Sequence, residues 1–455
     1  MTTLRALETC YPAFLNMIGY FAGVVEEMLT LRRIGRAYAE IIDGHALGIW
    51  SRLMTAVSIR DAFACGNLYV VRRAVEVIRR CAEKTISFRD IEVCFIRNGH
   101  PDIDTYLLST IPTIVNAIDW AGSTALMYTT TLQQTKASFK RMRLLIDNGA
   151  DVNAVNNEGH CALMATIASM FLTNDADPKY MRYLITNGAN VNARRGNISL
   201  LHRMTTLETI PIIPELRSAE QFSVFKELTR LRLRFSPESC HRPRLQIIQV
   251  LVESKASDID KVLLSVIVGL PNTRVDTVYE GAFDQNGYKR TIDIIHALMV
   301  GIDWNDRATG RTILHALLDT MQVMCEKYDS FADEDIEMYN NVISSVLDHD
   351  LYSDDISGSN AFHRTFHPST TKLLLEKIPQ SGRLLEATCS LGKTPIVAQV
   401  DRLHALFRPS VSRRAFTVSK RRIRRSIRAM LCAGAKWPAD RDYRDLDDNH
   451  VPYCV

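Results

Sequence analysis

Apolar residues recur at helical spacing along most of the chain, and short polar turns interrupt them at intervals. In residues 291–300, for example, Ile294, Ile295 and Leu298 lie three or four positions apart, as on one buried helix face. Apolar runs of this kind end at a turn residue, and a new helix-opening sequence follows. The pattern predicts many short helices joined by tight turns.

The strongest internal match lies between residues 144–153 and 183–192, which are 39 positions apart. The two segments read Leu-Leu-Ile-Asp-Asn-Gly-Ala-Asp-Val-Asn and Tyr-Leu-Ile-Thr-Asn-Gly-Ala-Asn-Val-Asn. In both, the apolar run stops at Asn-Gly, where glycine reaches the left-handed conformation without a side-chain clash. The match predicts a repeated unit of helix, stop and turn.

A second signature follows these stops and opens the next helix. Its copies lie at 122–126, 159–163, 197–202, 310–315, 358–363 and 392–396. The starts are spaced 37, 38, 113, 48 and 34 residues apart. Because the longest gap is close to three periods, we expect two degenerate units within it.

Together, the helix-opening turn, the helix pair and the Gly-Ala-Asp-Val-Asn stop resemble the ankyrin repeat, whose unit is about 33 residues. The resemblance covers 115–455 and implies an all-α solenoid of about eight or nine helix pairs with short β-hairpin fingers. It divides the chain into an N-terminal helical cap (1–50), degenerate repeats (51–118) and the solenoid (119–455). The solenoid has clear units at 119–202 and 305–400, degenerate units at 203–304 and a basic unit at 401–455.

The chain departs from the family pattern in two ways. Met127 and Met164 stand where the motif has histidine, and only 392–396 keeps Thr-Pro. The units are also longer, with extra residues expected as loops between the first and second helix. These loops are predicted at 129–140, 168–178, 204–244, 271–289, 321–337 and 402–422. Loops along one edge of a solenoid can carry binding, and tolerated drift is the alternative.

Composition adds constraints on class and compartment. Hydrophobic residues make up 46% of the 455, which is enough for a sizeable core, and a net charge of +4 does not indicate nucleic-acid binding. The ten cysteines form no Cys-x-x-Cys pair, which favours a reducing compartment. The apolar segment 11–25 is shorter than a bilayer span and favours a buried helix over a signal peptide. We therefore expect a cytoplasmic or nuclear protein without a membrane segment.

No pattern assembles a catalytic or metal site. The resemblance implies structural roles for His202, His315 and His363, each imidazole bonding to the backbone and to a neighbouring Thr or Ser hydroxyl. His363 and His367 are four residues apart, but two imidazoles without a third ligand make a poor metal site.

Other motifs for chemistry also fail. The Gly392-Lys393-Thr394 triplet lacks the first glycine of a phosphate loop, because residue 387 is alanine. We therefore expect a non-catalytic protein with no cofactor and no small-molecule substrate. The alternative, an enzyme with a non-repeat domain in 204–245, has no motif to support it.

A basic run stands near the C-terminus and comprises Lys420, Arg421, Arg422, Arg424, Arg425 and Arg428. Ile423, Ile427 and Met430 alternate with it at helical spacing, which predicts a helix with one core face and one arginine face. Three interpretations stay open: a solvated face, a nuclear-import signal, or a docking site for an acidic protein. Nucleic acid is disfavoured because no aromatic residues interleave.

For partner binding, the resemblance points to the fingertips between each stop and the next helix. The candidates are Trp120, Val155, Asn156, Asn157, Glu158, Arg194, Arg195, Trp304, Asp306 and Arg307. Tryptophan and arginine often dominate interface energy, although each residue could equally be ordinary surface. The expected function is a protein-interaction scaffold. The alternative is the substrate-recognition subunit of a ubiquitin ligase. No box motif for such recruitment is recognisable at either end, and residues 1–50 are the unassigned segment in which one would have to lie.

Overall fold

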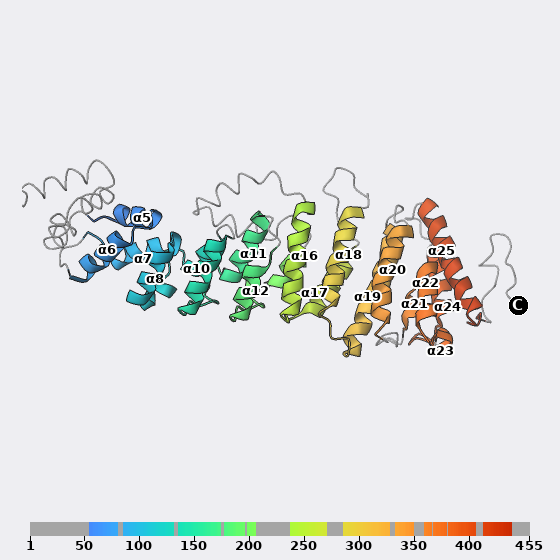
Figure 1. Cartoon of the computed structure of the whole chain (residues 1–455). Coiled ribbons are helices and arrows are strands. Elements are labelled where there is room, and N and C mark those ends of the chain that lie inside the picture. The colour runs from blue at the N-terminus through green and yellow to red at the C-terminus, as the bar shows by residue number, and fades with distance from the viewer. Residues whose placement is uncertain are drawn as a thin grey trace, which may run out of the picture. The chain divides into compact units, whose positions relative to one another are not determined.

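The computed structural model describes residues 54–80, 85–131, 135–173, 177–195, 198–205, 237–270, 285–327, 333–349, 359–365, 367–379, 381–405 and 413–438. The predicted cap (1–50) and the last residues (439–455) lie outside these ranges. The described chain is mostly helical (Figure 1), which confirms the all-α class. Its strands are β1 (Arg194–Arg195) and β2 (Ile198–Ser199), which pair antiparallel with Arg195 opposite Ile198.

The chain forms two compact units. Unit 1 comprises residues 1–200 and 212–243, and unit 2 comprises 201–211 and 244–455. The helices of unit 1 are α5 (Ala56–Ala64), α6 (Leu68–Arg80), α7 (Phe88–Arg97), α8 (Pro101–Thr110), the 3-10 helix η1 (Pro112–Asn116), α9 (Ala125–Thr131), α10 (Lys136–Asp147), α11 (Ala162–Thr173) and α12 (Lys179–Thr186).

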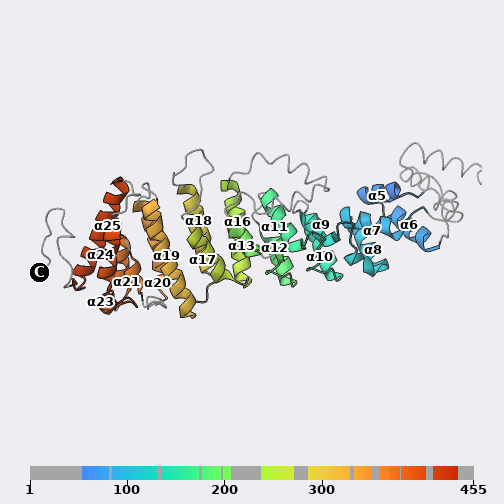
Figure 2. The same ribbon diagram turned by 180° about the vertical axis from the view of Figure 1, so that it is seen from behind.

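Helices of unit 1 pack in consecutive pairs. The first helices of the pairs form a row in which α5 contacts α7, α7 contacts α9, and α9 contacts α11. The second helices pack beside them, with α10 against α9 and α12 against α11 (Figure 2). Each pair therefore shelters the apolar face of its neighbour, as stacked repeats do.

Unit 2 has the same arrangement. Its helices are α17 (Ile259–Gly269), α18 (Gln285–Met299), α19 (Arg307–Lys327), α20 (Asp333–Leu347), α21 (Ala361–Arg364), α22 (Pro368–Lys377), α23 (Ser381–Glu386), α24 (Pro395–Ala405) and α25 (Arg413–Cys432). One row runs α17, α19, α21, α24 and the other runs α18, α20, α22, α25. Helices α13 (Leu200–Thr205) and α16 (Pro237–Glu253) span the division between the units.

The predicted helix stops adopt the geometry that glycine permits. Gly149 and Gly188 have φ of +86° and +89°. After the first of these stops, the Ala150 amide donates to the Leu145 carbonyl at 3.0 Å. The same stop occurs at Lys255, which has φ of +57°, where the Ala256 amide bonds to the Leu251 carbonyl at 3.1 Å. A stop without glycine therefore lies inside the degenerate stretch 203–304.

Asparagine side chains connect neighbouring stops in unit 1. Asn116 Nδ2 donates to the Gly149 carbonyl at 3.1 Å, and its Oδ1 accepts from the Asp151 amide at 2.8 Å. Asn153 repeats this pattern one unit later, donating to the Gly188 carbonyl at 2.9 Å and accepting from the Asn190 amide at 2.7 Å. Each asparagine satisfies backbone groups left over at a helix end, which holds adjacent turns in register.

A buried ion pair joins four helices of unit 1. Arg141 on α10 donates from Nε to Asp104 on α8 at 2.9 Å, and from Nη1 to Thr129 Oγ1 on α9 at 2.9 Å. Its Nη2 reaches the Phe95 carbonyl on α7. Asp104 has no exposed surface, and burial raises the pKa of its carboxyl although Arg141 opposes that rise.

Two expectations about local structure are wrong. The insertions are partly helical, because α19 continues to Lys327 and α25 already begins at Arg413. Met321 and Met324 are buried, so apolar contacts extend the helix where a loop was predicted. Helix α19 also begins at Arg307, which places Gly310 within its first turns rather than at a turn before it. Tertiary packing of apolar side chains outweighs the glycine here.

Candidate functional site

A tight turn at residues 118–124 forms the first described finger. Ile118 and Thr124 form an antiparallel bridge, and the Asp119 amide donates to the Ser123 carbonyl at 3.0 Å. The Gly122 amide closes the turn on the Asp119 carbonyl at 3.1 Å. Gly122 has φ of +76°, a conformation that disfavours any side chain. The finger is thus a short hairpin with its tip at residues 120–121.

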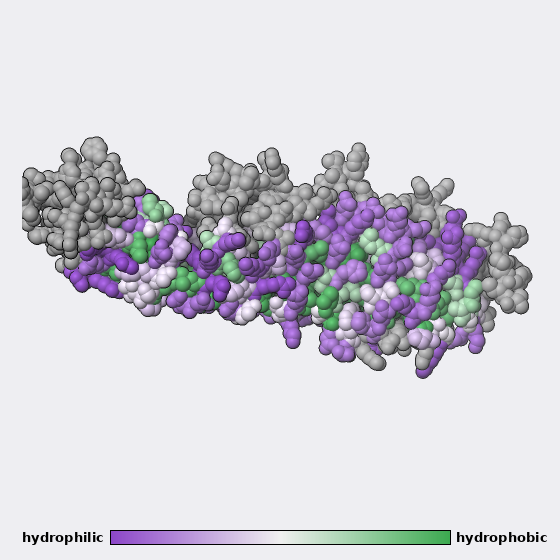
Figure 3. Space-filling view, in the orientation of Figure 1, coloured by the Kyte–Doolittle hydropathy of each residue, from purple (hydrophilic) through white to green (hydrophobic). Residues whose placement is uncertain are grey.

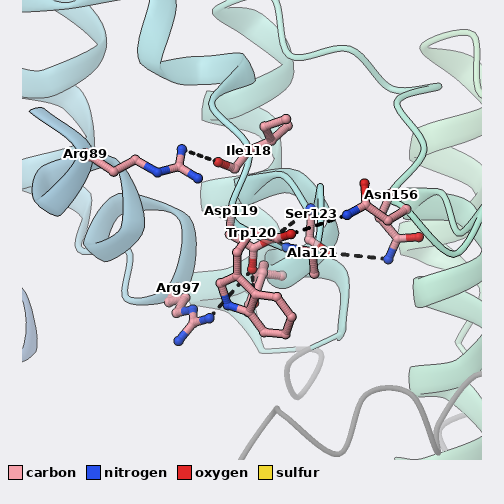
Figure 4. Close-up of polar contacts among 10 residues, drawn as sticks. Arg89, Arg97, Ile118, Asp119, Trp120, Ala121, Ser123 and Asn156 are labelled. Atoms are coloured by element: carbon pink, nitrogen blue, oxygen red, sulfur yellow. Dashed lines mark hydrogen bonds and ion pairs between the residues drawn. The ribbon is translucent and has the colours of Figure 1, made fainter.

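The Asp119 carboxylate organises this turn from inside (Figure 4). Its Oδ1 accepts from the Ala121 and Ser123 amides, both at 2.9 Å, and its Oδ2 accepts from the Tyr128 hydroxyl at 2.7 Å. Arg97 lies 3.7 Å from Oδ2. Burial and this hydrogen bond raise the pKa of Tyr128. Because Asp119 is only 3% exposed, these bonds hold the finger in one conformation.

The next finger uses the same device 37 residues later. Asn156 Oδ1 accepts from the Glu158 amide at 3.1 Å and the His160 amide at 2.9 Å, and Gly159 has φ of +79°. Asn157 connects this finger to the preceding one, because its amide donates to the Ala121 carbonyl at 3.0 Å. Its Nδ2 also donates to the Trp120 carbonyl at 3.3 Å. Asn156 and Asn157 therefore support the turns directly.

Apolar side chains remain exposed on these supported turns. Trp120 is 56% exposed, Val155 63%, Ile118 51% and Ile198, on β2, 45%. We call these four residues the fingertip surface. Large apolar side chains on a rigid frame bind a partner with little loss of conformational entropy, so the arrangement suits protein recognition.

The remaining predicted residues lie in different settings. Arg194 is exposed on β1, whereas the side chains of Arg195 and Arg307 lie outside the described part of the structure. Glu158 lies 3.3 Å from His160 Nδ1. Within unit 2, the Trp304 ring stacks on His349 with 4.6 Å between centroids.

Asp306 caps the start of α19. Its carboxylate accepts from the Ala308 amide at 3.1 Å and from the Thr309 hydroxyl at 2.6 Å. The Thr309 hydrogen bond is the main cause that lowers the pKa of Asp306. Asp306 and Trp304 thus serve local structure and belong to a different unit from the fingertip surface.

His363 is buried in a structural position. His363 Nε2 lies 2.9 Å from the Lys393 carbonyl, and Nδ1 lies 3.0 Å from Asn360 Oδ1, an amide oxygen rather than the expected hydroxyl. His367 precedes α22 as its N-cap, so it shares no helix with His363. Among the residues the structure describes, no cluster of His, Cys, Asp or Glu could hold a metal ion.

The basic run lies on α25, with Ile423, Ile427 and Met430 buried as predicted. The structure divides the predicted arginine face. Arg424 is buried at 8% exposed, and Lys420 is half-buried. The other four arginines, at positions 421, 422, 425 and 428, line a cleft of about 1030 Å³ together with residues of α20 and α22. Sequence reasoning missed the contribution of these two helices.

Cys432 also lines this cleft and is exposed. The cysteines at positions 65, 94, 161, 325, 389 and 432 are free thiols.

No helix within the described ranges has the length and apolar character to cross a bilayer. Comparison with known proteins found no matching family model and no matching curated protein. Function must therefore be inferred from the chain's own residues.

Proposed function

We propose that this chain is a non-catalytic protein-interaction scaffold built from divergent ankyrin-type repeats. Its fingertip surface (Ile118, Trp120, Val155 and Ile198) binds a protein partner. Two observations support the repeat assignment: the paired helices with glycine stops, and the recurrence of the same capped turn at Asp119 and Asn156. Both arise from short local sequences that recur 39 and 37 residues apart, respectively.

The observation that carries the proposal is the exposure of Trp120 on a turn that is fixed from within. An indole costs free energy when its apolar surface faces water, about 25 cal/mol for each Å². A flexible tip could fold Trp120 inward, but the bonds of Asp119 and Asn157 hold its backbone in place. Tryptophan in this setting is the residue type most often found at the centre of protein interfaces.

Site-specific photocrosslinking tests this function. A photoreactive amino acid replaces Trp120 or, in a second variant, Val155, and the purified full chain is irradiated in cell extract. We expect both positions to crosslink the same partner band, because Asn157 joins the two turns that carry them. Val300 provides a matched control, since it is 79% exposed but lies in a helix-connecting turn of unit 2.

The result that contradicts the proposal is equal crosslinking from positions 120, 155 and 300, which would indicate nonspecific contact. Loss of the shared band on Trp120→Ala, with helix content unchanged by circular dichroism, would add independent support. Residues 1–50, the unassigned segment to which the ubiquitin-ligase alternative would assign recruitment, lie outside the described structure.

A further inference from the structure

Residues of three helices in unit 2, α20, α22 and α25, line the cleft. Figure 1 shows α22 between α20 and α25, and both outer helices contact it. Hydrogen bonds join α20 to α22: Asn340 on α20 donates to Ser369 Oγ at 3.0 Å and accepts from Thr370 Oγ1 at 2.7 Å. On the other side, Thr371 Oγ1 lies 2.6 Å from Ser426 Oγ of α25. The three helices therefore present a preformed groove.

The charge of the cleft is strongly positive. Its lining cations are Arg421, Arg422, Arg425, Arg428 and Lys372, and its lining carboxylates are Asp333 and Glu337. His367 adds no charge at neutral pH, because burial and the nearby Arg422 lower its pKa to about 4. Hydrophilic side chains also predominate over α25 in the view of Figure 3.

Two of these cations are not neutralised by the described protein. Arg421 and Arg425 are exposed, and neither forms an ion pair with a described residue. Asp333 and Glu337, the carboxylates that line the cleft, likewise form no ion pair with the described residues of α25. Guanidinium groups left unpaired in a groove can form bidentate, charge-assisted hydrogen bonds with carboxylates or phosphates.

The spacing of the arginines fits an extended chain. Arg421 and Arg425 are one turn apart on α25, which separates them by about 6 Å along the helix axis. Alternate residues of an extended peptide are about 6.6 Å apart and point to the same side. Two acidic residues at positions i and i+2 can thus each meet one arginine.

From this geometry we propose that the cleft between α20, α22 and α25 binds an acidic peptide segment of a partner protein, with carboxylate or phosphorylated side chains at alternate positions. The inference deepens the proposed scaffold function by naming the partner's chemistry. It uses a surface of unit 2, whereas the fingertip surface belongs to unit 1.

Other polyanions fit the cleft less well. Asp333 and Glu337 would repel a continuous phosphate backbone, and no Phe, Tyr or Trp side chain lines the groove to stack on bases. A membrane surface is flat on this scale, whereas the cations lie within a concave groove. An extended peptide can place its acidic side chains toward α25 and its neutral ones toward α20.

Fluorescence anisotropy with the full-length chain tests the proposal. The probe is fluorescein-labelled Gly-Glu-Gly-Glu-Gly-Glu-Gly, with its phosphoserine and glutamine counterparts. We expect the glutamate or phosphoserine peptide, or both, to bind, and the glutamine peptide to bind at least about tenfold more weakly. The stronger of the first two identifies which anion the cleft prefers. Affinity should fall when salt rises from about 50 to 200 mM.

Variants assign binding to the cleft. Arg421→Gln/Arg425→Gln should weaken the acidic peptide at least about tenfold, since each substitution removes a charge-assisted bond. Arg383→Gln, an exposed arginine of α23 outside the cleft, is the matched control and should change affinity less than twofold. Bound peptide should also protect Cys432 from alkylation while exposed Cys65 of unit 1 reacts as before.

Four results would overturn the proposal. These are no detectable binding of either acidic peptide, equal binding of the glutamine peptide, unchanged affinity in the arginine double variant, or tighter arginine-dependent binding of single-stranded DNA or phosphatidylserine vesicles. Failure of the fingertip function can be distinguished from failure of the cleft proposal, because Trp120→Ala should leave the affinity of the cleft for the acidic peptide unchanged. Circular dichroism of each variant confirms that helix content is retained.

Discussion

Replacing Asp119 by alanine removes the acceptor at the centre of the first finger. The carboxylate serves the amides of Ala121 and Ser123 and the hydroxyl of Tyr128. The methyl group of alanine accepts none of these bonds. The perturbation is local, because these three donors belong to the finger and to the first turns of α9.

The cost follows from the burial of each donor. Ser123 is 2% exposed, so its amide loses its acceptor without access to water, which costs about 1–3 kcal/mol. Tyr128 is 7% exposed, and its hydroxyl loses a charge-assisted bond worth about 1 kcal/mol after reorientation. Ala121 is half-buried and Arg97 is partly exposed, so water replaces most of what they lose. The sum is about 3 kcal/mol.

Asp119→Asn provides the matched comparison. Asn156 already makes the equivalent pair of amide bonds in the next finger, so an asparagine oxygen is sufficient there. At position 119 the asparagine Nδ2 can also donate to the Tyr128 hydroxyl oxygen. The substitution therefore loses only the electrostatic attraction between Arg97 and the carboxylate. We expect a cost of about 1 kcal/mol or less.

Amide hydrogen exchange followed by mass spectrometry measures both variants locally, which suits a repeat protein whose units need not unfold together. A loss of about 3 kcal/mol accelerates exchange at Ser123 by about a hundredfold. Exchange in α25 should not change and serves as the internal control. If Asp119→Asn accelerates exchange at Ser123 as much as Asp119→Ala, the buried acceptor is not what holds the finger.

Three further predictions concern stability. Lys255→Gly should raise the free energy of unfolding in urea by about 0.5 kcal/mol. The φ of +57° strains the lysine backbone, and relief of that strain outweighs the extra conformational entropy that glycine has in the unfolded chain. Gly149→Ala should lower the free energy of unfolding by about 1 kcal/mol, because alanine would have to adopt positive φ. Arg141→Met should lower the free energy of unfolding by about 3 kcal/mol, because it leaves Asp104 buried without its cation. Adding Asp104→Leu should restore most of that stability. If it does not, the loss does not come from the unpaired carboxylate. The free energy of unfolding should fall by up to about 3 kcal/mol as pH drops from 6.5 to about 4, because His367 binds a proton in the unfolded chain but not in the folded one. The thermal midpoint of His367→Asn should lack the part of the pH dependence that His367 causes.

Local signals made much of the helical architecture predictable. The stops at Gly149 and Gly188 are visible because glycine is nearly alone in adopting positive φ at low cost. The stop at Lys255 could not be predicted from the sequence, because lysine does not indicate a left-handed conformation. The buried face of α25 was predictable from apolar spacing, but the burial of Arg424 was not, because arginine spacing does not indicate what packs beside it.

The amino-acid sequence by itself determined that helices alternate with capped turns that recur along the chain, because helix stops and caps depend on residues a few positions apart. Only the tertiary structure decided which side chains meet. It brought Glu337, Ser369 and Arg425 into one cleft and left Trp120 exposed while stacking Trp304 on His349. The physical reason is that helix packing joins residues dozens of positions apart, and no local pattern encodes that distance.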